Sequence, residues 1–451
     1  MIEGRAAGPL PVGAGSQNIQ GTCNSFADPL GPSTVQCLGA KNFFAKKRNE
    51  GSVRQPPNRT AAGLSFDGRT MPTHPAPLGG EPPLESAPQN GAALERALLQ
   101  RLRTQTKPPG SLGLLEQIGM KLGLLKGTIH PKAEVFRLCV FAGSHGITNC
   151  GVSAYPAAVT AQMVGNFLAG GAAVCVLAKA AGASLHIIDT GVDFDDHAES
   201  PPHQSSHPSP NGPRFFQRAS RRGTRCFSQE PAMTPEECDN ALAAGREQVH
   251  LALADGIDVL GIGEMGIGNS TCAAALCAAL LPAPPEAVVG LGTGVDDAGL
   301  KRKAQVVAEA VQKYTVHIHD QTSGRRWLEC VGGYEIAAMT GCILAAAEAS
   351  LPLLVDGFIA SAAALVALRM NASALNGCFF AHQSAEAGHA LLLKNLGATP
   401  LLHLGMRLGE GTGVALAFPL LRAAARLLSE MATFESAGVS TALAGTPSIP
   451  R

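Results

Sequence analysis

The sequence IDVLGIGEMGIGNST, residues 257–271, joins an apolar run to a glycine-rich turn and to the start of an alanine-rich segment. The run at 257–262 is rich in Ile, Val and Leu and is bounded by glycines, which is typical of a buried strand. Residues 272–281 are mostly Ala and Leu and predict a helix directly after the turn. A strand that passes through a glycine turn into a helix is the unit from which parallel α/β sheets are built.

The same alternation continues on both sides of this stretch. Further strands are expected at 135–142, 184–189 and 352–356, and the run at 400–404 predicts a strand or a turn. Helices are expected at 92–103, 112–126, 159–181, 236–253, 298–313, 335–349 and 414–428, and Ser111 is expected to cap the second of them. Strands that alternate with helices predict a Rossmann-like parallel sheet with helices on both faces. Ligands of such folds bind at the carboxyl ends of the strands, where the glycine turns fall.

The composition argues against several classes of protein. The 451 residues carry no net charge, so nothing favours binding to nucleic acid or to an anionic membrane. The longest apolar stretch, 342–368, is interrupted by Glu348, Pro352 and Asp356, and no transmembrane helix is predicted. His317 and His319 have a spacing that a metal could use, but no acidic or Cys cluster accompanies them. Neither a metal nor an organic cofactor is predicted.

The cysteines and the polar segments bear on compartment and on domain limits. The twelve cysteines include no CxxC pair, and several lie in apolar runs, namely Cys139, Cys175, Cys277 and Cys342. They are interpreted as buried side chains in a reducing compartment, the cytoplasm or an organelle.

Residues 1–90 are rich in Pro, Gly, Ser and Asn and are interpreted as a disordered or targeting extension to a folded module at 91–451. Residues 195–214, rich in His, Ser and Pro, are expected to form a flexible insertion.

The glycine turn allows two functional interpretations. Residues 261–266, GIGEMG, match the dinucleotide-binding fingerprint, but no acidic residue ends a second strand about 20 positions later. The glycines continue through Gly268 to Asn269, which suits one phosphate better than a pyrophosphate. A tight strand-to-helix turn without a ligand is the alternative. A second glycine loop at 290–297 precedes the basic residues 301–303, one of which could reach a phosphate.

A third loop, MRLGEGTG at 406–413, places one acidic residue between glycines. Gly409 and Gly411 leave no side chain beside Glu410, so a ligand could approach its carboxylate. Gly411, Thr412 and Gly413 are expected to begin the next helix, whose N–H groups favour an anion. This loop therefore predicts a general base on an exposed loop beside an anion-binding site. The alternative is that Glu410 only caps the helix.

Several stretches together resemble the family of nicotinate-nucleotide:dimethylbenzimidazole phosphoribosyltransferases, which act in cobalamin lower-ligand assembly. They are KPPGSLG at 107, GVSAYPAAVTAQM at 151, GEMGIGNST at 263, GTGVDDAGLKRK at 292, DGFIASAAAL at 356, AHQSAEAGH at 381 and RLGEGTG at 407. These motifs occur in consistent order over about residues 92–440. The resemblance implies a large α/β part at about 131–419 and a small helical part made from about 91–130 and 420–451. It also implies a homodimer without metal.

The resemblance further implies a reaction and a set of site residues. The family transfers the 5-phosphoribosyl group of nicotinate mononucleotide to 5,6-dimethylbenzimidazole, with inversion at C1′ to α-ribazole 5′-phosphate. Its general base corresponds to Glu410. The expected donor-binding residues are Glu264, Gly266, Gly268, Asn269, Lys303, Gly411, Thr412 and Gly413. The expected acceptor-binding residues are Ser153, Tyr155, Gln162, Met163 and Met406.

The chain departs from the family pattern at three positions. Ser144 stands where the family usually has Asp, and Leu291 and Leu114 stand where it usually has Arg. These changes leave room for another acceptor base, such as adenine or a phenol, or for a catalytically silent nucleotide-binding protein. A dinucleotide-dependent dehydrogenase is the more distant alternative.

Overall fold

The computed structural model describes residues 91–194, 212–281, 283–320 and 322–441. The predicted extension at 1–90 and nearly all of the predicted insertion at 195–214 lie outside these residues. Arg214, at the end of that insertion, is instead the first residue of a strand.

Seven parallel strands form one sheet in the order β3-β2-β1-β4-β5-β6-β7. The strands are β1 (Phe136–Gly143), β2 (Ser184–Gly191), β3 (Arg214–Gln217), β4 (Val259–Met265), β5 (Leu353–Val355), β6 (Cys378–His382) and β7 (Pro400–Leu402). The chain adds β2 and β3 on one side of β1, and then starts again at β4 on its other side. The strand order therefore reverses between β1 and β4, which is where doubly wound sheets bind ligands.

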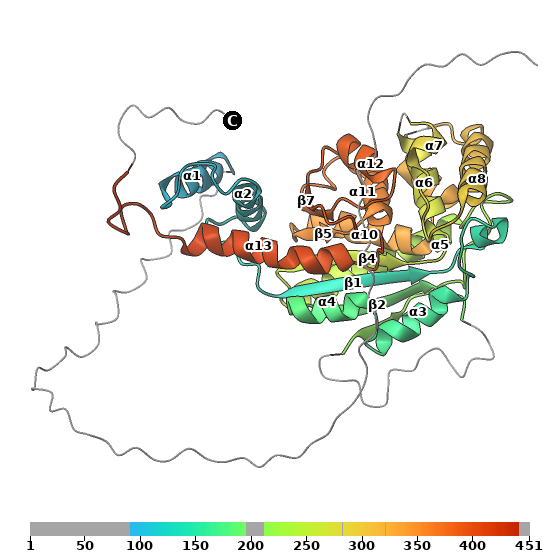
Figure 1. Ribbon diagram of the computed structural model, residues 1–451, viewed down its shortest axis with the longest axis horizontal. Helices are drawn as coiled ribbons and strands as arrows, with labels where there is room; N and C mark the ends of the chain where they lie inside the picture. Colours follow the sequence, from blue (N-terminus) through green and yellow to red (C-terminus); the bar gives the residue numbers. More distant parts are fainter. Residues whose placement is uncertain (1–90, 195–211, 282, 321, 442–451) are drawn as a thin grey trace, which may run out of the picture. The chain divides into compact units, whose positions relative to one another are not determined.

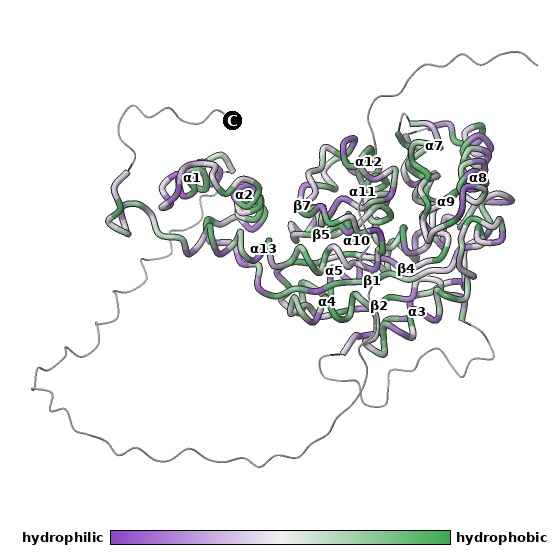
Figure 2. Tube along the Cα trace, viewed as in Figure 1, coloured by the Kyte–Doolittle hydropathy of each residue, from purple (hydrophilic) through white to green (hydrophobic). Residues whose placement is uncertain are grey.

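Helices cover both faces of the sheet, as the sequence predicts (Figure 1). One face carries α3 (Val159–Leu168), α4 (Ala173–Ala181) and α13 (Thr412–Glu430). The other carries α5 (Pro235–Ala254), α6 (Asn269–Leu280), α7 (Pro285–Val288), α8 (Asp297–Thr315), α9 (Gly324–Val331), α10 (Tyr334–Glu348), α11 (Phe358–Met370) and α12 (His389–Asn395). Alternate residues of β1 enter opposite layers, Leu138 and Val140 on one face, Cys139 and Phe141 on the other. The central strands are therefore apolar on both sides. Figure 2 shows the hydropathy of each residue along the chain.

Two glycines of the dinucleotide-like fingerprint are required for helix packing. Gly261 lies inside β4, and a Cβ there would collide with the Val414 side chain of α13. A Cβ on Gly263 would collide with the backbone of Gly411 at the start of the same helix. These glycines thus bring α13 into close approach with the strand, which accounts for the fingerprint without a dinucleotide.

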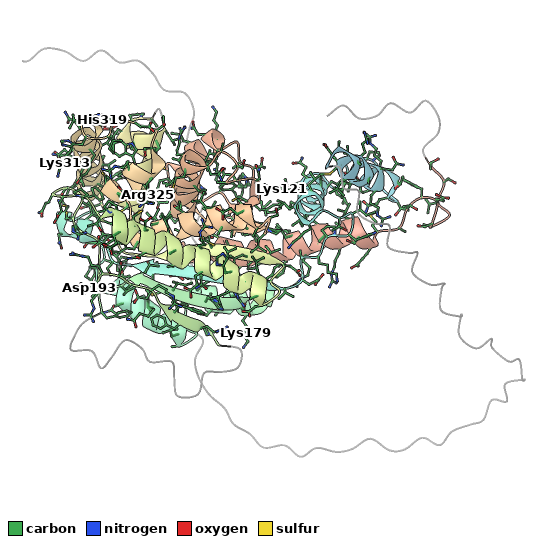
Figure 3. The ribbon with its side chains drawn as sticks, turned by 180° about the vertical axis from the view of Figure 1, so that it is seen from behind. Lys121, Lys179, Asp193, Lys313, His319 and Arg325 are labelled. Atoms are coloured by element: carbon green, nitrogen blue, oxygen red, sulfur yellow. The ribbon has the colours of Figure 1, made fainter. Side chains whose placement is uncertain are left out.

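The helices α1 (Gly91–Thr104) and α2 (Leu114–Lys126) pack with the C-terminal part of α13. Leu94 and Leu98 are buried with Leu428, and the Arg101 guanidinium donates to the Leu428 carbonyl at 3.0 Å. On α2, the Lys121 ammonium donates to the Cys378 carbonyl of β6 at 2.5 Å (labelled in Figure 3). Both ends of the described chain therefore contribute to the helical part, and α13 is shared between it and the sheet.

Several local predictions were wrong. Ser111 does not cap α2, because that helix begins at Leu114 with Gly113 at its N-cap and no side-chain cap. The single helix expected at 159–181 is two helices, because the chain turns at Gly170, which has a φ of 78°. The strands β3 and β6 were not predicted, and β3 begins inside the stretch that was interpreted as a flexible insertion.

By length and composition alone, two apolar helical segments could cross a membrane, Val159–Ala181 and Thr412–Glu430. The first is the pair α3 and α4, and the second is α13, whose apolar side chains pack on the sheet. Over half of the most apolar window of Thr412–Glu430 is buried inside the fold, compared with 28% of that of Val159–Ala181.

Candidate active site

The candidate site lies at the carboxyl ends of the central strands, next to the point where the strand order reverses. Glu264 is the penultimate residue of β4, Asp356 directly follows β5, and His382 ends β6. The loop that carries Glu410 joins this edge through the hydrogen bond from the Glu410 N–H to the Glu264 carbonyl, 3.2 Å long. The fold thus brings residues from four separate segments to one edge.

Glu410 is buried and has an unusual backbone conformation. Its φ is 63°, in the left-handed region that non-glycine residues rarely adopt, and Gly409 and Gly411 on either side have φ values of 83° and 82°. A Cβ on Gly409 would collide with the Glu264 carboxylate, so the glycine is needed for this approach. Glu410 is 5% exposed, and its Oε2 atom is buried without a hydrogen-bond partner. The expectation of an exposed loop carboxylate was therefore wrong.

The N-terminus of α13 binds an anion, and that anion is the carboxylate of Asp356. Its Oδ2 accepts from the Gly411 N–H at 3.0 Å, and its Oδ1 accepts from Gly413 and Val414 at 2.9 and 3.2 Å. The prediction that the amides of Gly411 and Gly413 bind the donor phosphate is therefore corrected, because these donors are already used. The capping alternative also fails, since α13 has Gly411 at its N-cap and no side-chain cap.

Burial and neighbouring carboxylates raise the pKa values of two acids here. Burial first, and then the Asp356 carboxylate, raise the pKa of Glu410 to about 7. Burial, and then the charges of Asp356, Glu335 and Glu410, raise the pKa of Glu264 to about 8, although its hydrogen bond from Asn269 opposes this. Both carboxyl groups therefore hold their protons to a higher pH than an ordinary glutamic acid does.

Lys303 approaches the same edge from α8. Its ammonium is buried and donates to the Ser270 hydroxyl at 2.9 Å and to the Gly290 carbonyl at 3.0 Å. Lys303 thus links the first glycine loop, where Gly266 and Gly268 form the turn into α6, to the second. Burial lowers the pKa of Lys303 to about 8, against the attraction of Glu386.

The predicted acceptor residues lie on two neighbouring segments and on the loop before Glu410. The Ser153 hydroxyl lies 3.1 Å from that of Thr293, which joins the acceptor segment to the second glycine loop. Tyr155 is 55% exposed. On α3, Gln162 is exposed and Met163 packs against the core cluster that contains Met265 and Ile267. The Met406 carbonyl accepts from the Ala385 N–H at 2.9 Å.

Four polar residues of this region were not among the predicted site residues. They are Ser270, Glu335, Asp356 and Glu386. Ser270, Asp356 and Glu386 lie inside the motifs GEMGIGNST, DGFIASAAAL and AHQSAEAGH, which was the available signal. Glu335 lies outside every motif, and its carboxylate binds the buried His145 ring at 2.9 Å.

The positions that depart from the family pattern have different surroundings. The Ser144 hydroxyl accepts from the Asp193 N–H at 3.0 Å, so it holds the chain after β2. Leu291 is 46% exposed on the second glycine loop, where the Arg407 guanidinium donates to the Gly292 carbonyl at 3.0 Å. Leu114 begins α2 and packs against the core on the α13 face of the sheet.

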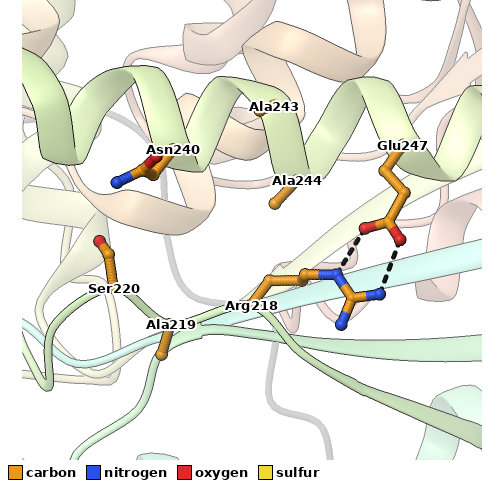
Figure 4. Close-up of a pocket in the computed structure, with 7 residues that line it drawn as sticks. All are labelled: Arg218, Ala219, Ser220, Asn240, Ala243, Ala244 and Glu247. Carbon is orange, nitrogen blue, oxygen red and sulfur yellow. Dashed lines mark hydrogen bonds and ion pairs between the residues drawn. The ribbon is translucent and has the colours of Figure 1, made fainter.

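Other features of the described residues do not form this site. A cavity of about 480 Å³ lies between α5 and the chain after β3, where Arg218 forms a bidentate pair with Glu247 (Figure 4). Within the described part of the chain, no three His, Cys, Asp or Glu residues are arranged to hold a metal. His317 and His319 are exposed on either side of the buried Ile318 (His319 is labelled in Figure 3).

Comparison with known proteins identifies the family. A family model described as phosphoribosyltransferase matches residues 87–439. The nicotinate-nucleotide–dimethylbenzimidazole phosphoribosyltransferase of Cupriavidus taiwanensis is 46% identical over 361 residues, which cover 80% of this chain and 98% of that protein. The chain belongs to the nicotinate-nucleotide–dimethylbenzimidazole phosphoribosyltransferase family. It is accordingly an enzyme that transfers a phosphoribosyl group.

Further relatives agree with this assignment. The protein of the same name from Dechloromonas aromatica is 45% identical over 361 residues, with 79% of this chain and 97% of that protein covered. The crystal structure of CobT from Thermus thermophilus superposes with a TM-score of 0.71 at 45% identity, covering 78% of this chain and all of that one. The family-level prediction of an α/β fold with additional helices is thereby confirmed.

Proposed function

We propose that the chain transfers the 5-phosphoribosyl group of nicotinate mononucleotide to 5,6-dimethylbenzimidazole, with Glu410 as the general base. The observation that carries this proposal is the buried Glu410 carboxylate, with an unpaired oxygen and a pKa of about 7, at the ligand-binding edge of the sheet. A base works best when its pKa lies near the working pH.

The reaction needs one proton acceptor. The bond between the donor's pyridinium nitrogen and C1′ breaks, and nicotinate leaves as a neutral pyridine ring without needing an acid. A ring nitrogen of the acceptor forms the new bond to C1′ from the opposite face, which inverts the configuration. The other ring nitrogen loses its proton to Glu410. Positioning of donor and acceptor supplies the rest of the rate enhancement.

The donor is proposed to lie between the two glycine loops, with its phosphate near Lys303 and Ser270. Both side chains come together there, and α6 begins at this point without a side-chain cap. A helix N-terminus and a lysine ammonium together favour a phosphate. Gly266, Gly268 and Asn269 keep their proposed part in this turn. Thr412, whose hydroxyl donates to the Gly409 carbonyl at 2.8 Å, stays a proposed donor-binding residue. Glu264, whose pKa is raised to about 8 by burial, is proposed to contact the phosphoribosyl donor from β4.

The acceptor is proposed to lie against Tyr155, Met163 and Met406, with Ser153 and Gln162 setting its orientation. Aromatic and thioether side chains suit a flat, apolar ring.

We further propose that the enzyme is a homodimer, which light scattering on the purified chain would test. A reducing compartment is proposed because the cysteines of the described residues are free thiols.

The proposed function is tested by identifying the product. The full chain is incubated with nicotinate mononucleotide and a mixture of dimethylbenzimidazole, adenine and phenol, and products are separated by mass spectrometry. We expect α-ribazole 5′-phosphate, with the α configuration verified by NMR. A different nucleotide product would establish another acceptor, and donor binding without any product would establish a silent binder.

We expect Lys303→Met to raise the donor KM more than the acceptor KM. The methionine retains most of the buried stem but removes the charge that is proposed to attract the phosphate. Steady-state kinetics with each substrate varied in turn measures the two constants. An unchanged donor KM in a folded variant would remove Lys303 from the donor site.

Gln162→Ala is expected to change the ranking of acceptor bases. Gln162 is exposed on α3 and makes little contribution to packing, so its loss should alter recognition without unfolding the chain. The measurement is kcat/KM for a panel of benzimidazoles and purines, with Gln305→Ala, an exposed glutamine on α8, as the control. An equal loss for every base would contradict the acceptor assignment.

The pH dependence of kcat/KM for the donor is expected to be bell-shaped. Activity should rise with pH through about 7, because Glu410 must lose its proton before it can act as a base. Activity should fall through about 8, because Lys303 then becomes neutral and attracts the phosphate less. A profile that is flat between pH 6 and 9 would contradict both assignments.

A further inference from the structure

Glu386 is a buried carboxylate that the proposed reaction does not yet use. It follows β6 and is 8% exposed, and its Oε2 atom has no hydrogen-bond partner in the described structure. Its backbone is held on both sides, by the bond from its N–H to the Ser384 hydroxyl and by the His389 N–H that donates to its carbonyl. A buried carboxylate with an unpaired oxygen is costly unless a ligand supplies a donor.

The free oxygen of Glu386 lies against the second glycine loop. A Cβ on Gly290 would collide with Oε2, so the loop approaches the carboxylate closely because this residue is glycine. The carbonyl of the same Gly290 accepts from the Lys303 ammonium at 3.0 Å. A carboxylate and an ammonium thus border one glycine residue, and Glu386 is the main charge that attracts Lys303.

The Glu386 carboxylate and the Lys303 ammonium favour different chemical groups, which can belong to one ligand. An anionic carboxylate repels a phosphate and accepts hydrogen bonds from hydroxyl groups, whereas an ammonium attracts a phosphate. A phosphoribosyl group carries both, since its ribose hydroxyls and its 5-phosphate belong to one small unit. No other proposed contact accounts for recognition of the ribose hydroxyls at this loop.

We propose that Glu386 binds a ribose hydroxyl of the donor, while Lys303 on the other side of Gly290 binds its phosphate. This inference rests on the proposed function and names the residue that makes the donor site specific for a ribose. Glu386 is thereby a specificity-determining residue.

The test compares variants with donors that lack single groups. Glu386→Ala and Glu386→Gln are assayed with nicotinate mononucleotide and with its 2′-deoxy and 3′-deoxy forms. Loss of a hydrogen bond to a charged group corresponds to about 10- to 100-fold in kcat/KM. We expect Glu386→Ala to show this loss with the parent donor and almost none with the analogue that lacks the bound hydroxyl.

Lys303→Met is the matched control, because its loss should be the same for all three donors and should vanish with nicotinate riboside, which has no phosphate. An equal loss for all three donors with Glu386→Ala would overturn the inference and make Glu386 a support for the loop. Should Glu386→Ala fail to fold, judged by thermal unfolding, the comparison is made with Glu386→Gln, which keeps the side-chain volume.

Failure of the proposed function has a different signature. If the wild-type chain forms no riboside from any base, donor binding is measured by calorimetry with the same donors and variants. If both the 2′-deoxy and the 3′-deoxy donor then bind as tightly as the parent to the wild type, the role of Glu386 is overturned by itself.

Discussion

We expect Glu410→Gln to lower kcat by about 10²–10⁴-fold with both substrates saturating, the usual cost of losing a general base. Glutamine keeps the size of the side chain but cannot accept the proton that the acceptor ring must lose. The measurement is kcat beside thermal unfolding of the same preparation.

The stability of this variant should not fall with its activity. Burial raises the pKa of Glu410 to about 7 in the folded chain, so the folded state holds its proton where the unfolded chain, with an ordinary carboxyl, has lost it. This contribution to stability is present below the unfolded pKa and is lost as pH rises through about 7. At pH 8 a neutral glutamine avoids the buried charge, and we expect Glu410→Gln to be at least as stable as the wild type.

A surface carboxylate provides the control for this comparison. Glu348 is largely exposed and pairs with Arg246, so Glu348→Gln should leave kcat unchanged and cost about 0–1 kcal/mol. Near-wild-type kcat in folded Glu410→Gln would remove Glu410 from the role of base.

The second large effect concerns stability. We expect Glu335→Ala to lower the free energy of unfolding by about 3–5 kcal/mol, because it removes one partner of a buried charged pair. The Glu335 and His145 side chains are both fully buried and lie 2.9 Å apart. Gly143 and Gly333 pack closely against the Glu335 carboxylate, where a Cβ would come within 2.8 Å and 2.7 Å of it. Alanine would therefore leave an unpaired histidine beside an empty space.

The loss of unfolding free energy in Glu335→Ala should depend on pH. Burial alone would lower the pKa of His145, but Glu335 and Cys272 raise it well above its ordinary value. The stability from this pair is fully present below the unfolded pKa of about 6.5 and is lost as pH rises through the higher folded value.

Urea unfolding at pH 6 and at pH 9 measures this dependence, and we expect the larger deficit at pH 6. Glu335→Gln, which keeps the volume and an acceptor for the ring, should lose less stability than Glu335→Ala. A deficit of less than about 1 kcal/mol at pH 6 would show that the pair does not stabilise the fold.

The local sequence pattern was sufficient to predict much of the secondary structure. The apolar run at 257–262, its glycine turn and the helix after it are visible because burial and turn geometry leave marks within a few residues. The same holds for the helices α5, α8 and α10, whose observed limits lie within two residues of those expected. The ordered motifs likewise predicted the family, which the comparisons confirmed.

The local sequence pattern was insufficient to predict the contacts of a residue whose partner is distant in the sequence. From the sequence, the backbone N–H groups at the start of α13 were predicted to be free to bind a ligand. In the structure, the Gly411 N–H donates to Asp356, which lies 55 residues earlier in the chain. Glu410 was predicted to be exposed because it lies between two glycines. The left-handed turn at 409–411 instead places it against β4, where it is buried. The pairing of Lys303 with Ser270 depends on the placement of α8 beside α6. The sequence alone therefore determined the glycine loops, the central strands and several of the helices. The tertiary structure decided which charged groups at the sheet edge are already paired and which remain free for a ligand, because that pairing depends on strand order and not on spacing along the chain.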